Sequence, residues 1–304
     1  MNRPTPLTAA ALKRHPLPPV AGGDKDSHGQ ILIIAGSRDV PGAGLLAAHG
    51  AMRAGAGKLQ LAAPDDIAIP LGIAMPEAMV TGFATARDGG FSRRAVAAML
   101  DMAGGADAIV AGPGLRDNPA ATRLAGDLCA LGKPLVLDAA LLHALPAKAT
   151  DARHADVPPI LLPHAGEMAS LLDCDPAEVE ADPLAAGRAC AARYDSLVLV
   201  KGVASHIVTP DGRAWRYSGG GPGLGVSGSG DVLAGIIGGL LARSAAPLTA
   251  LLWGVWLHGE AGRRLAEKIG PLGFLAREIP PKIPRCCLNP RASPTRRPRS
   301  ARHG

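Results

Sequence analysis

Aromatic side chains are scarce in this chain: Phe, Trp and Tyr together make up 3% of its 304 residues. Proteins that bind RNA or single-stranded DNA stack bases on such rings, so we expect no nucleic-acid partner. Five cysteines are too few and too irregularly spaced for a disulfide framework, and none forms a C-x-x-C pair. This usage is typical of a reducing compartment, and it predicts a cytoplasmic protein.

The excess of positive charge lies at one end of the chain, and the rest has no net charge of either sign. The formal net charge is +6, yet residues 285–304 contain six arginines and no acidic side chain, so the remainder is neutral in sum. This Pro-, Arg- and Ser-rich end cannot build a core, and we expect a disordered basic tail there. No run of about 18 apolar residues could span a membrane. The N-terminus also lacks the apolar stretch of a signal peptide.

Apolar residues, at 47%, are sufficient for a large core. Short apolar runs typical of strands buried on both faces lie at Ile31–Ala35, Leu59–Ala63, Ala108–Ala111, Pro134–Asp138, Ile160–Pro163 and Leu197–Lys201. Helical patterns lie at Ala43–Ala54, Ser92–Ala103, Ala120–Leu131, His164–Leu172, Pro183–Arg193, Ser229–Arg243 and Pro247–Ile269. Asp211-Gly212 between two β-like runs predicts a small β-hairpin. The alternation predicts one α/β domain with a mostly parallel central sheet and helices on both faces.

Glycines follow the first and third predicted strands, where ligands bind in sheets of this kind. Gly36-Ser37 and Gly42-Ala43-Gly44 come after the first strand, and Gly112-Pro113-Gly114 comes after the third. Glycine lets the backbone approach a ligand, and a helix N-terminus favours negative charge. Tight turns alone explain the same residues, so the glycines by themselves decide nothing.

Ionisable side chains follow the later strands. Asp138 ends one strand, His164 follows the next with Glu167 three residues on, and Lys201 ends the last. The spacing of His164 and Glu167 fits a helix capping box, and capping is the simpler interpretation for Glu167. Lys201 is compatible with a solvated charge and with a donor to phosphate.

The strongest motif is Gly228-Ser229-Gly230-Asp231 at the start of a predicted apolar helix. Backbone N–H groups at such a start form a cradle for phosphate oxygens. Asp231 either complements the helix dipole or acts as a general base, and the glycines ahead of it favour the base. No Gly-Lys-Ser/Thr follows the glycines, so the segment is not a Walker A loop.

Gly-Ser-Gly-Asp before a late apolar helix resembles the anion-hole and catalytic-base motif of ribokinase-like kinases. Together with Gly112-Pro-Gly-Leu115, Leu162-Pro-His-Ala-Gly-Glu-Met168 and Val200-Lys-Gly202, it resembles the ADP/ATP-dependent (S)-NAD(P)H-hydrate dehydratases. The resemblance implies a ribokinase-like domain at residues 24–284, after a lead segment at 1–23 and before the tail at 285–304. It also implies the repair of hydrated NADH or NADPH by a carbon–oxygen lyase that uses Mg²⁺ and ADP, or ATP.

The resemblance also implies roles for individual residues. It assigns the hydrate to Ala43, Gly114, His164 and Asp231, with Asp231 as the catalytic base. It assigns the adenine nucleotide to Lys201, Gly202, Val203, Ala204, Ser205, Gly228, Ser229 and Gly230. The residues that would hold a metal stay unknown.

This sequence departs from the family pattern after the fourth predicted strand. The family usually has Asp-Ala-Asp, whereas Ala140 stands in place of the second acid here. Stand-alone relatives usually use ADP and form tetramers, so we expect an ADP-dependent homotetramer. An NAD(P)H-hydrate epimerase is expected as a separate protein that works alongside it. The choices between ADP and ATP and between NADH and NADPH stay open.

Two other functions stay open at this point. A ribokinase-like kinase of a vitamin precursor, such as hydroxyethylthiazole or pyridoxal, shares the Gly-x-Gly-Asp motif. The His-Ala-Gly-Glu and Gly-Pro-Gly-Leu segments fit the dehydratases better. A non-catalytic nucleotide-binding protein would account for the missing acid at Ala140. Phosphate release from ADP or ATP, with and without hydrated NADPH, separates the three.

Overall fold

The apolar runs of the sequence form one sheet of ten strands in the order β1-β10-β9-β8-β7-β6-β5-β2-β3-β4. The structure is a computed structural model that describes residues 3–19, 25–143, 145 and 157–288. The strands are β1 (Thr5–Pro6), β2 (Gln30–Ile34), β3 (Lys58–Pro64), β4 (Ala78–Phe83), β5 (Ala108–Ala111), β6 (Leu135–Leu137), β7 (Ile160–Leu161), β8 (Leu197–Val200), β9 (Ser205–Val208) and β10 (Ala214–Tyr217). Neighbours are parallel except around β9, which is antiparallel to β8 and β10.

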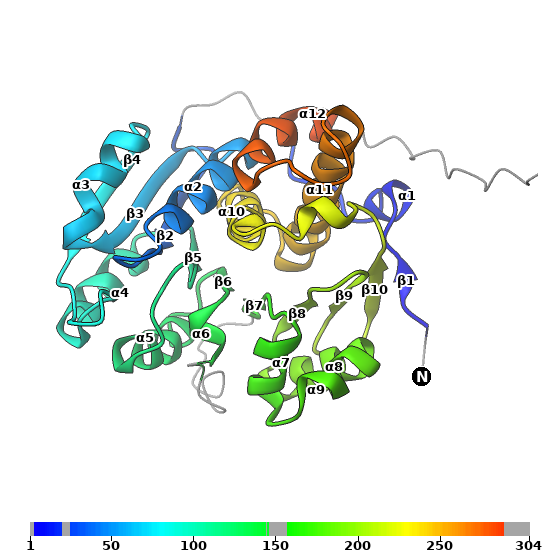
Figure 1. The fold of residues 1–304 in the computed structure, drawn as a ribbon, viewed down its shortest axis with the longest axis horizontal. Helices are drawn as coiled ribbons and strands as arrows, with labels where there is room; N and C mark the ends of the chain where they lie inside the picture. Colours follow the sequence, from blue (N-terminus) through cyan, green and yellow to red (C-terminus); the bar gives the residue numbers. More distant parts are fainter. Residues whose placement is uncertain (1–2, 20–24, 144, 146–156, 289–304) are drawn as a thin grey trace, which may run out of the picture.

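Helices cover both faces of this sheet (Figure 1). One face carries α1 (Ala9–Leu12), α2 (Gly42–Ala54), α10 (Ser229–Ala242), α11 (Pro247–Lys268) and α12 (Ile283–Leu288). The other carries α4 (Val96–Gly104), α5 (Pro119–Ala130), α6 (Ala140–His143), α7 (Ala165–Leu172), α8 (Pro176–Ala181) and α9 (Pro183–Tyr194). In β2, Ile31 and Ile33 face the first layer, and Leu32 and Ile34 the second. The expected strand burial on both faces is therefore confirmed.

Small residues let α10 cross α2 at very short range. A Cβ added to Gly235 would overlap the carbonyl oxygen of Ala47, and one added to Gly239 would overlap that of Ala51. A Cβ on Gly50 of α2 would lie 2.5 Å from the Val232 carbonyl oxygen. This backbone-to-backbone crossing fixes α10, and with it the Gly-Ser-Gly-Asp segment at its start.

The predicted elements are present, with differences at their ends and at the edges of the sheet. The structure adds β1, β4, α1, α3 (Asp65–Ala74), α6, α8 and α12, and it divides the helix expected at 92–103 into a 3₁₀ turn (Arg93–Ala95) and α4. Further 3₁₀ turns lie at Pro222–Leu224, Ala276–Glu278 and Pro280–Lys282. The edge elements are short or only partly buried, so apolar periodicity marks them weakly.

Both ends of the predicted domain reach further than expected. Residues 1–23 were expected to precede the domain, but β1 pairs with β10, and Leu7 and Leu12 are buried. The first residues of the tail expected from 285 belong to the domain, because α12 runs to Leu288 and Cys286 is fully buried. Residues 289–304 of that tail lie outside the described residues.

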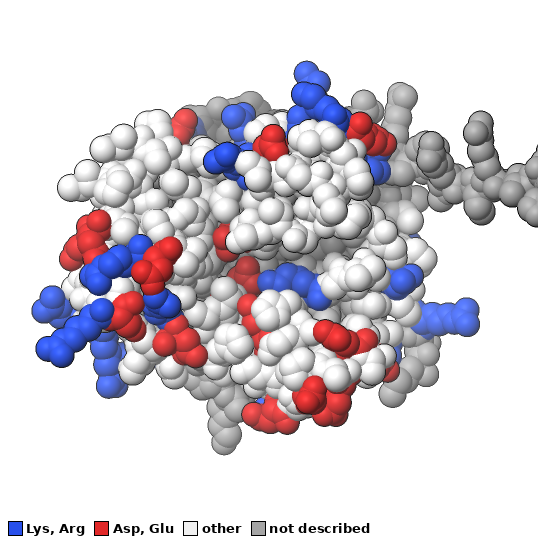
Figure 2. All heavy atoms as spheres, in the orientation of Figure 1, with Lys and Arg blue, Asp and Glu red and all other residues white. Residues whose placement is uncertain are grey.

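Among the described residues, no helix is both long and apolar enough to cross a membrane. Figure 2 shows acidic side chains gathered over the region of α7–α9, and charges of both signs where the molecule is hollowed between its two helical layers. That hollow lies at the end of the sheet to which the predicted site residues belong.

Candidate active site

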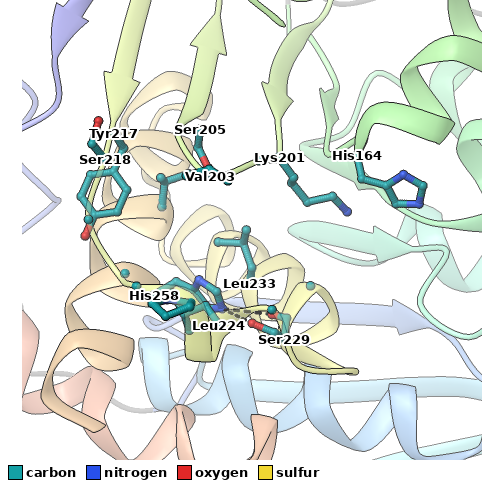
Figure 3. Close-up of a pocket in the computed structure, with 18 of the residues that line it drawn as sticks. His164, Lys201, Val203, Ser205, Tyr217, Ser218, Leu224, Ser229, Leu233 and His258 are labelled. Carbon is teal, nitrogen blue, oxygen red and sulfur yellow. Dashed lines mark hydrogen bonds between the residues drawn. The ribbon is translucent and has the colours of Figure 1, made fainter. Parts of the chain in front are cut away.

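A cavity of about 760 Å³ opens where β8 ends and α10 begins (Figure 3). The turn after β8, the segment after β10 and the facing sides of α10 and α11 form its walls. Of the residues expected at the nucleotide, the lining includes Lys201, Gly202, Val203, Ser205, Ser229 and Gly230. Ala204 and Gly228 are not among the lining residues, but their chain neighbours are. The structure therefore brings two distant segments to one cavity.

One side of this cavity is apolar. Tyr217, Leu224 and Leu233 lie along it. Glycine is required beside the Tyr217 ring, because a Cβ on Gly219 or Gly259 would overlap its hydroxyl group. Such a surface can accept a planar, weakly polar ring. Sequence reasoning missed these residues, since single apolar side chains between glycines carry no recognisable signal.

Lys201, at the end of β8, contacts a carboxylate at the end of β6 and another in the first turn of α7. Its Nζ donates to Asp138 Oδ1 at 2.8 Å and lies 3.6 Å from Glu167 Oε2. Both carboxylates are buried. Burial lowers the pKa of Lys201, but the charges of Asp138 and Glu167 outweigh it, so the pKa is raised. The ammonium group therefore stays charged and can neutralise a phosphate.

His164 caps α7 and also faces the cavity. Its Nδ1 accepts the N–H groups of Gly166 and Glu167 at 3.0 and 3.4 Å, and Glu167 Oε2 accepts the His164 N–H at 2.8 Å. The capping interpretation of Glu167 is thus confirmed. Because Nδ1 accepts, the proton of a neutral His164 ring lies on Nε2. The ring lines the cavity, where its Nε2 lies 3.4 Å from Glu167 Oε1, so Glu167 holds the ring from both sides.

The start of α10 has free capacity for an anion. Gly228 stands before the helix with φ of 85°, which glycine adopts readily, and no side chain caps the helix start. The Ser229 N–H donates to Val226 O at 3.1 Å, so it is already used. Lys201 Nζ lies 3.8 Å from where a Gly230 Cβ would be. A phosphate group at Gly230 would therefore meet both a helix N-terminus and an ammonium group.

Asp231 lies next to this cradle in a setting that suits a base. Burial raises its pKa to about 7, the charge of Asp138 raises it too, and Lys201 opposes both. A carboxyl group with that pKa is poised to exchange a proton at neutral pH. A helix-dipole partner alone would need no such environment.

Ala43 and Gly114 meet at a second place, beyond the ends of β2 and β5. The chain leaves these adjacent strands toward opposite edges of the sheet, which is where ligands bind in doubly wound folds. Gly114 (φ 66°) packs on Ala43, because a Cβ there would lie 2.7 Å from the Ala43 Cβ. Neither residue lines the cavity. A Cβ on Gly112 would overlap the Asp138 carbonyl oxygen. The loop after β5 therefore lies against Asp138, the residue that pairs with Lys201.

The side chains near the cavity give limited support to the predicted Mg²⁺. Within the described ranges, no three His, Cys, Asp or Glu side chains converge as ligands. Asp138 and Glu167 both face Lys201. An all-protein Mg²⁺ cage does not fit this site, whereas Mg²⁺ commonly binds through substrate phosphates with one or two carboxylates.

The family model of the NAD(P)H-hydrate dehydratases matches residues 31–285. The chain belongs to this family. It is 48% identical to an ADP-dependent (S)-NAD(P)H-hydrate dehydratase of Xanthomonas campestris, over 91% of this chain and 94% of that protein. It is 36% identical to the bifunctional NAD(P)H-hydrate repair enzyme Nnr of Moorella thermoacetica, over 90% of this chain and 52% of that protein. The chain thus spans about half of that bifunctional relative.

The fold comparison agrees with the family. A crystal structure of the ADP/ATP-dependent NAD(P)H-hydrate dehydratase from Bacillus subtilis, co-crystallised with ATP/Mg²⁺, has a TM-score of 0.78 and 30% identity. The match covers 94% of this chain and 98% of that one. The resemblance and the fold class expected for this NAD(P)H-hydrate dehydratase family member are confirmed.

Proposed function

We propose that this protein dehydrates the S-form of hydrated NADH or NADPH in a reaction driven by an adenine nucleotide. The observation that supports this most is Asp231, held near Lys201 at the start of α10 with its pKa raised to about 7. Family membership and relatives named ADP-dependent (S)-NAD(P)H-hydrate dehydratase support the substrate and ADP.

The first step is phosphoryl transfer to the hydroxyl group of the hydrate. Asp231 takes the hydroxyl proton as the oxygen attacks the terminal phosphorus of ADP, and the bond to the leaving AMP oxygen breaks. The Gly230 amide and the Lys201 ammonium neutralise charge on the transferring group. His164, which lines the cavity, helps to hold the hydrate.

The second step is elimination, which makes the enzyme a carbon–oxygen lyase. The lone pair of the ring nitrogen expels phosphate, a far better leaving group than hydroxide. Loss of a proton from the neighbouring ring carbon then restores the double bond. The loops at Ala43 and Gly114 are proposed to hold the dinucleotide, since they lie at the switch point of the sheet.

Mg²⁺ is proposed to enter on the nucleotide phosphates. When bound there it would neutralise phosphate charge. Because Asp138 and Glu167 are engaged by Lys201, we assign neither of them to the metal.

The compartment, the oligomeric state and the partner enzyme are also part of the proposal. We expect a cytoplasmic homotetramer that works with a separate epimerase, which would convert the R-form of the hydrate into the S-form. Light scattering at several protein concentrations tests the tetramer, and addition of an epimerase to racemic hydrate tests the partnership.

Recovery of reduced-nicotinamide absorbance from purified S-hydrate tests the function. We expect recovery with ADP or ATP, none without nucleotide, and none from the R-hydrate. Asp231→Asn is the matched inactive control. No recovery with either nucleotide, together with phosphate transfer to hydroxyethylthiazole or pyridoxal, would support a vitamin-precursor kinase instead. Nucleotide binding with neither reaction would support a non-catalytic protein.

A further inference from the structure

His258 lies in the middle of α11, directly after the apolar stretch 250–257. Its side chain is 9% exposed, and the ring lines the nucleotide cavity next to Gly259 (Figure 3). A polar side chain buried at such a place costs free energy unless it is hydrogen-bonded. No step of the proposed reaction uses His258.

The partner of His258 is the first residue of α10. Its Nε2 lies 3.0 Å from Ser229 Oγ and 3.1 Å from the Ser229 carbonyl oxygen. A carbonyl oxygen accepts only, so Nε2 carries the proton and donates to both atoms. Burial lowers the pKa of His258 to about 4, with Lys201 acting in the same direction, so the ring is neutral at pH 7.

This assignment fixes what the Ser229 hydroxyl group can do. Because Nε2 already holds a proton, it cannot accept the hydroxyl proton. Among the described residues, Ser229 Oγ makes no other hydrogen bond, and Ser229 lines the cavity beside Gly230. The hydroxyl proton is therefore available to a ligand at the helix start.

We propose that His258 is a positioning residue, which turns the Ser229 hydroxyl group so that it donates to a phosphoryl oxygen of the bound nucleotide. This inference rests on the proposed nucleotide dependence and adds a donor to the cradle. The Ser229 hydroxyl supplies the contact that its own N–H cannot, because that N–H bonds Val226. His258 acts through Ser229 and does not itself touch the phosphate.

The test compares two variants of similar size. His258→Gln keeps an N–H donor near the place of Nε2, whereas His258→Met removes it. We expect His258→Met to weaken ADP binding, measured by calorimetry, and to lower kcat/KM by about tenfold. His258→Gln should stay within about threefold of the wild type. The KM for the hydrate should change little in either variant.

Ser229 supplies an independent arm, which holds even if His258→Met folds poorly. Ser229→Ala should weaken ADP binding as much as His258→Met does, and Ser229→Thr, which keeps a hydroxyl group, should bind normally. In the double variant Ser229→Ala/His258→Met the losses should not add, since the two residues act as one unit. Additive losses would overturn the coupling.

The outcomes separate this inference from the function on which it rests. Normal ADP affinity and kcat/KM in His258→Met, with only a lower melting temperature, would overturn it in favour of a structural role. ADP binding by the wild type without turnover of the hydrate would overturn the proposed function alone, because the affinity comparison still applies. Failure of the wild type to bind ADP and ATP would overturn both.

Discussion

Asp231 carries a burial cost that its proposed role requires. Its pKa is about 7 in the folded protein, against an ordinary 3.8. Between these values the folded state binds more protons than the unfolded chain, so stability falls as pH rises through this range. The contribution of the protonated group is complete below about pH 4 and is lost above pH 7. Above pH 7 the folded protein is therefore less stable than a variant with an uncharged side chain at position 231 would be.

Asp231→Asn should consequently trade activity for stability. The amide cannot take a proton, so turnover should fall by roughly 10²–10⁴-fold. It also carries no charge to bury, so the melting temperature should rise at pH 8 and hardly change at pH 4. Because the pKa of Asp231 differs by about three units between the folded and unfolded states, the gain in the free energy of unfolding is at most about 4 kcal/mol. Near-normal turnover, or equal stability gains at both pH values, would contradict the assignment.

Asp138 adjusts the environment of that base. Its charge raises the pKa of Asp231 and it holds Lys201, whose charge acts in the opposite direction. Asp138→Asn removes the first effect and frees Lys201 to approach Asp231, so both consequences lower the pKa of Asp231. The acid limb of the kcat/KM profile should then move down by about one pH unit. The surface substitution Asp127→Asn, on α5, is the control and should leave the limb in place.

At the residue scale, the sequence predicted site residues that follow strands and one at the start of a helix. Lys201, His164 and Asp231 could be found because each follows a recognisable glycine or apolar pattern. It could not reveal that Asp138 and Lys201, 63 residues apart, form an ion pair. His258 had one usable signal, a polar residue directly after the apolar stretch of α11. Its partner Ser229 depends on how two helices pack, which no local pattern records.

At the scale of elements, the crossing of α2 and α10 determines where the cradle lies. Gly235→Ala puts a methyl group against the Ala47 carbonyl oxygen, and rigid backbone on both sides cannot yield. We expect a loss of about 2–3 kcal/mol in the free energy of unfolding, although alanine favours helices. Gly104→Ala is the control, since a Cβ there meets nothing within 4 Å and should cost nothing. Urea denaturation of both variants measures the difference, and equal stabilities would show that the crossing relaxes.

Element prediction succeeded where burial on both faces gives long apolar runs. The helix Pro247–Lys268 and the strand Gln30–Ile34 are close to the expected bounds. It failed at α3 and β4, where the side chains Ile69, Ile73 and Met79 are exposed and break the expected periodicity. Pairing along an edge of the sheet, not local propensity, decides that such segments are ordered.

At the scale of the whole molecule, the N-terminal segment completes the sheet. Without β1, β10 would be an edge strand with unpaired backbone groups. The Trp253 Nε1–H donates to His15 O at 2.7 Å, and the His15 ring packs edge-on against Trp215. These contacts join the start of the chain to α11 near the cavity. Composition alone could not place residues 3–19, since the contacts that join them to the sheet and to α11 come from distant segments.

The C-terminal end offers a comparison of two truncations that differ by four residues. Removal of 289–304 takes away five of the six arginines beyond position 284 and little apolar material. Melting temperature and turnover should therefore stay unchanged.

Removal of 285–304 also deletes part of α12 with its buried Cys286. It should cost about 1–3 kcal/mol, because apolar atoms of the layer that holds α2 and α11 are then exposed to water. Thermal melts of the two truncated proteins beside the full chain measure both effects. A large loss in the shorter deletion would mean that the basic segment docks on the domain, and equal stability of all three would mean that α12 contributes nothing to the core.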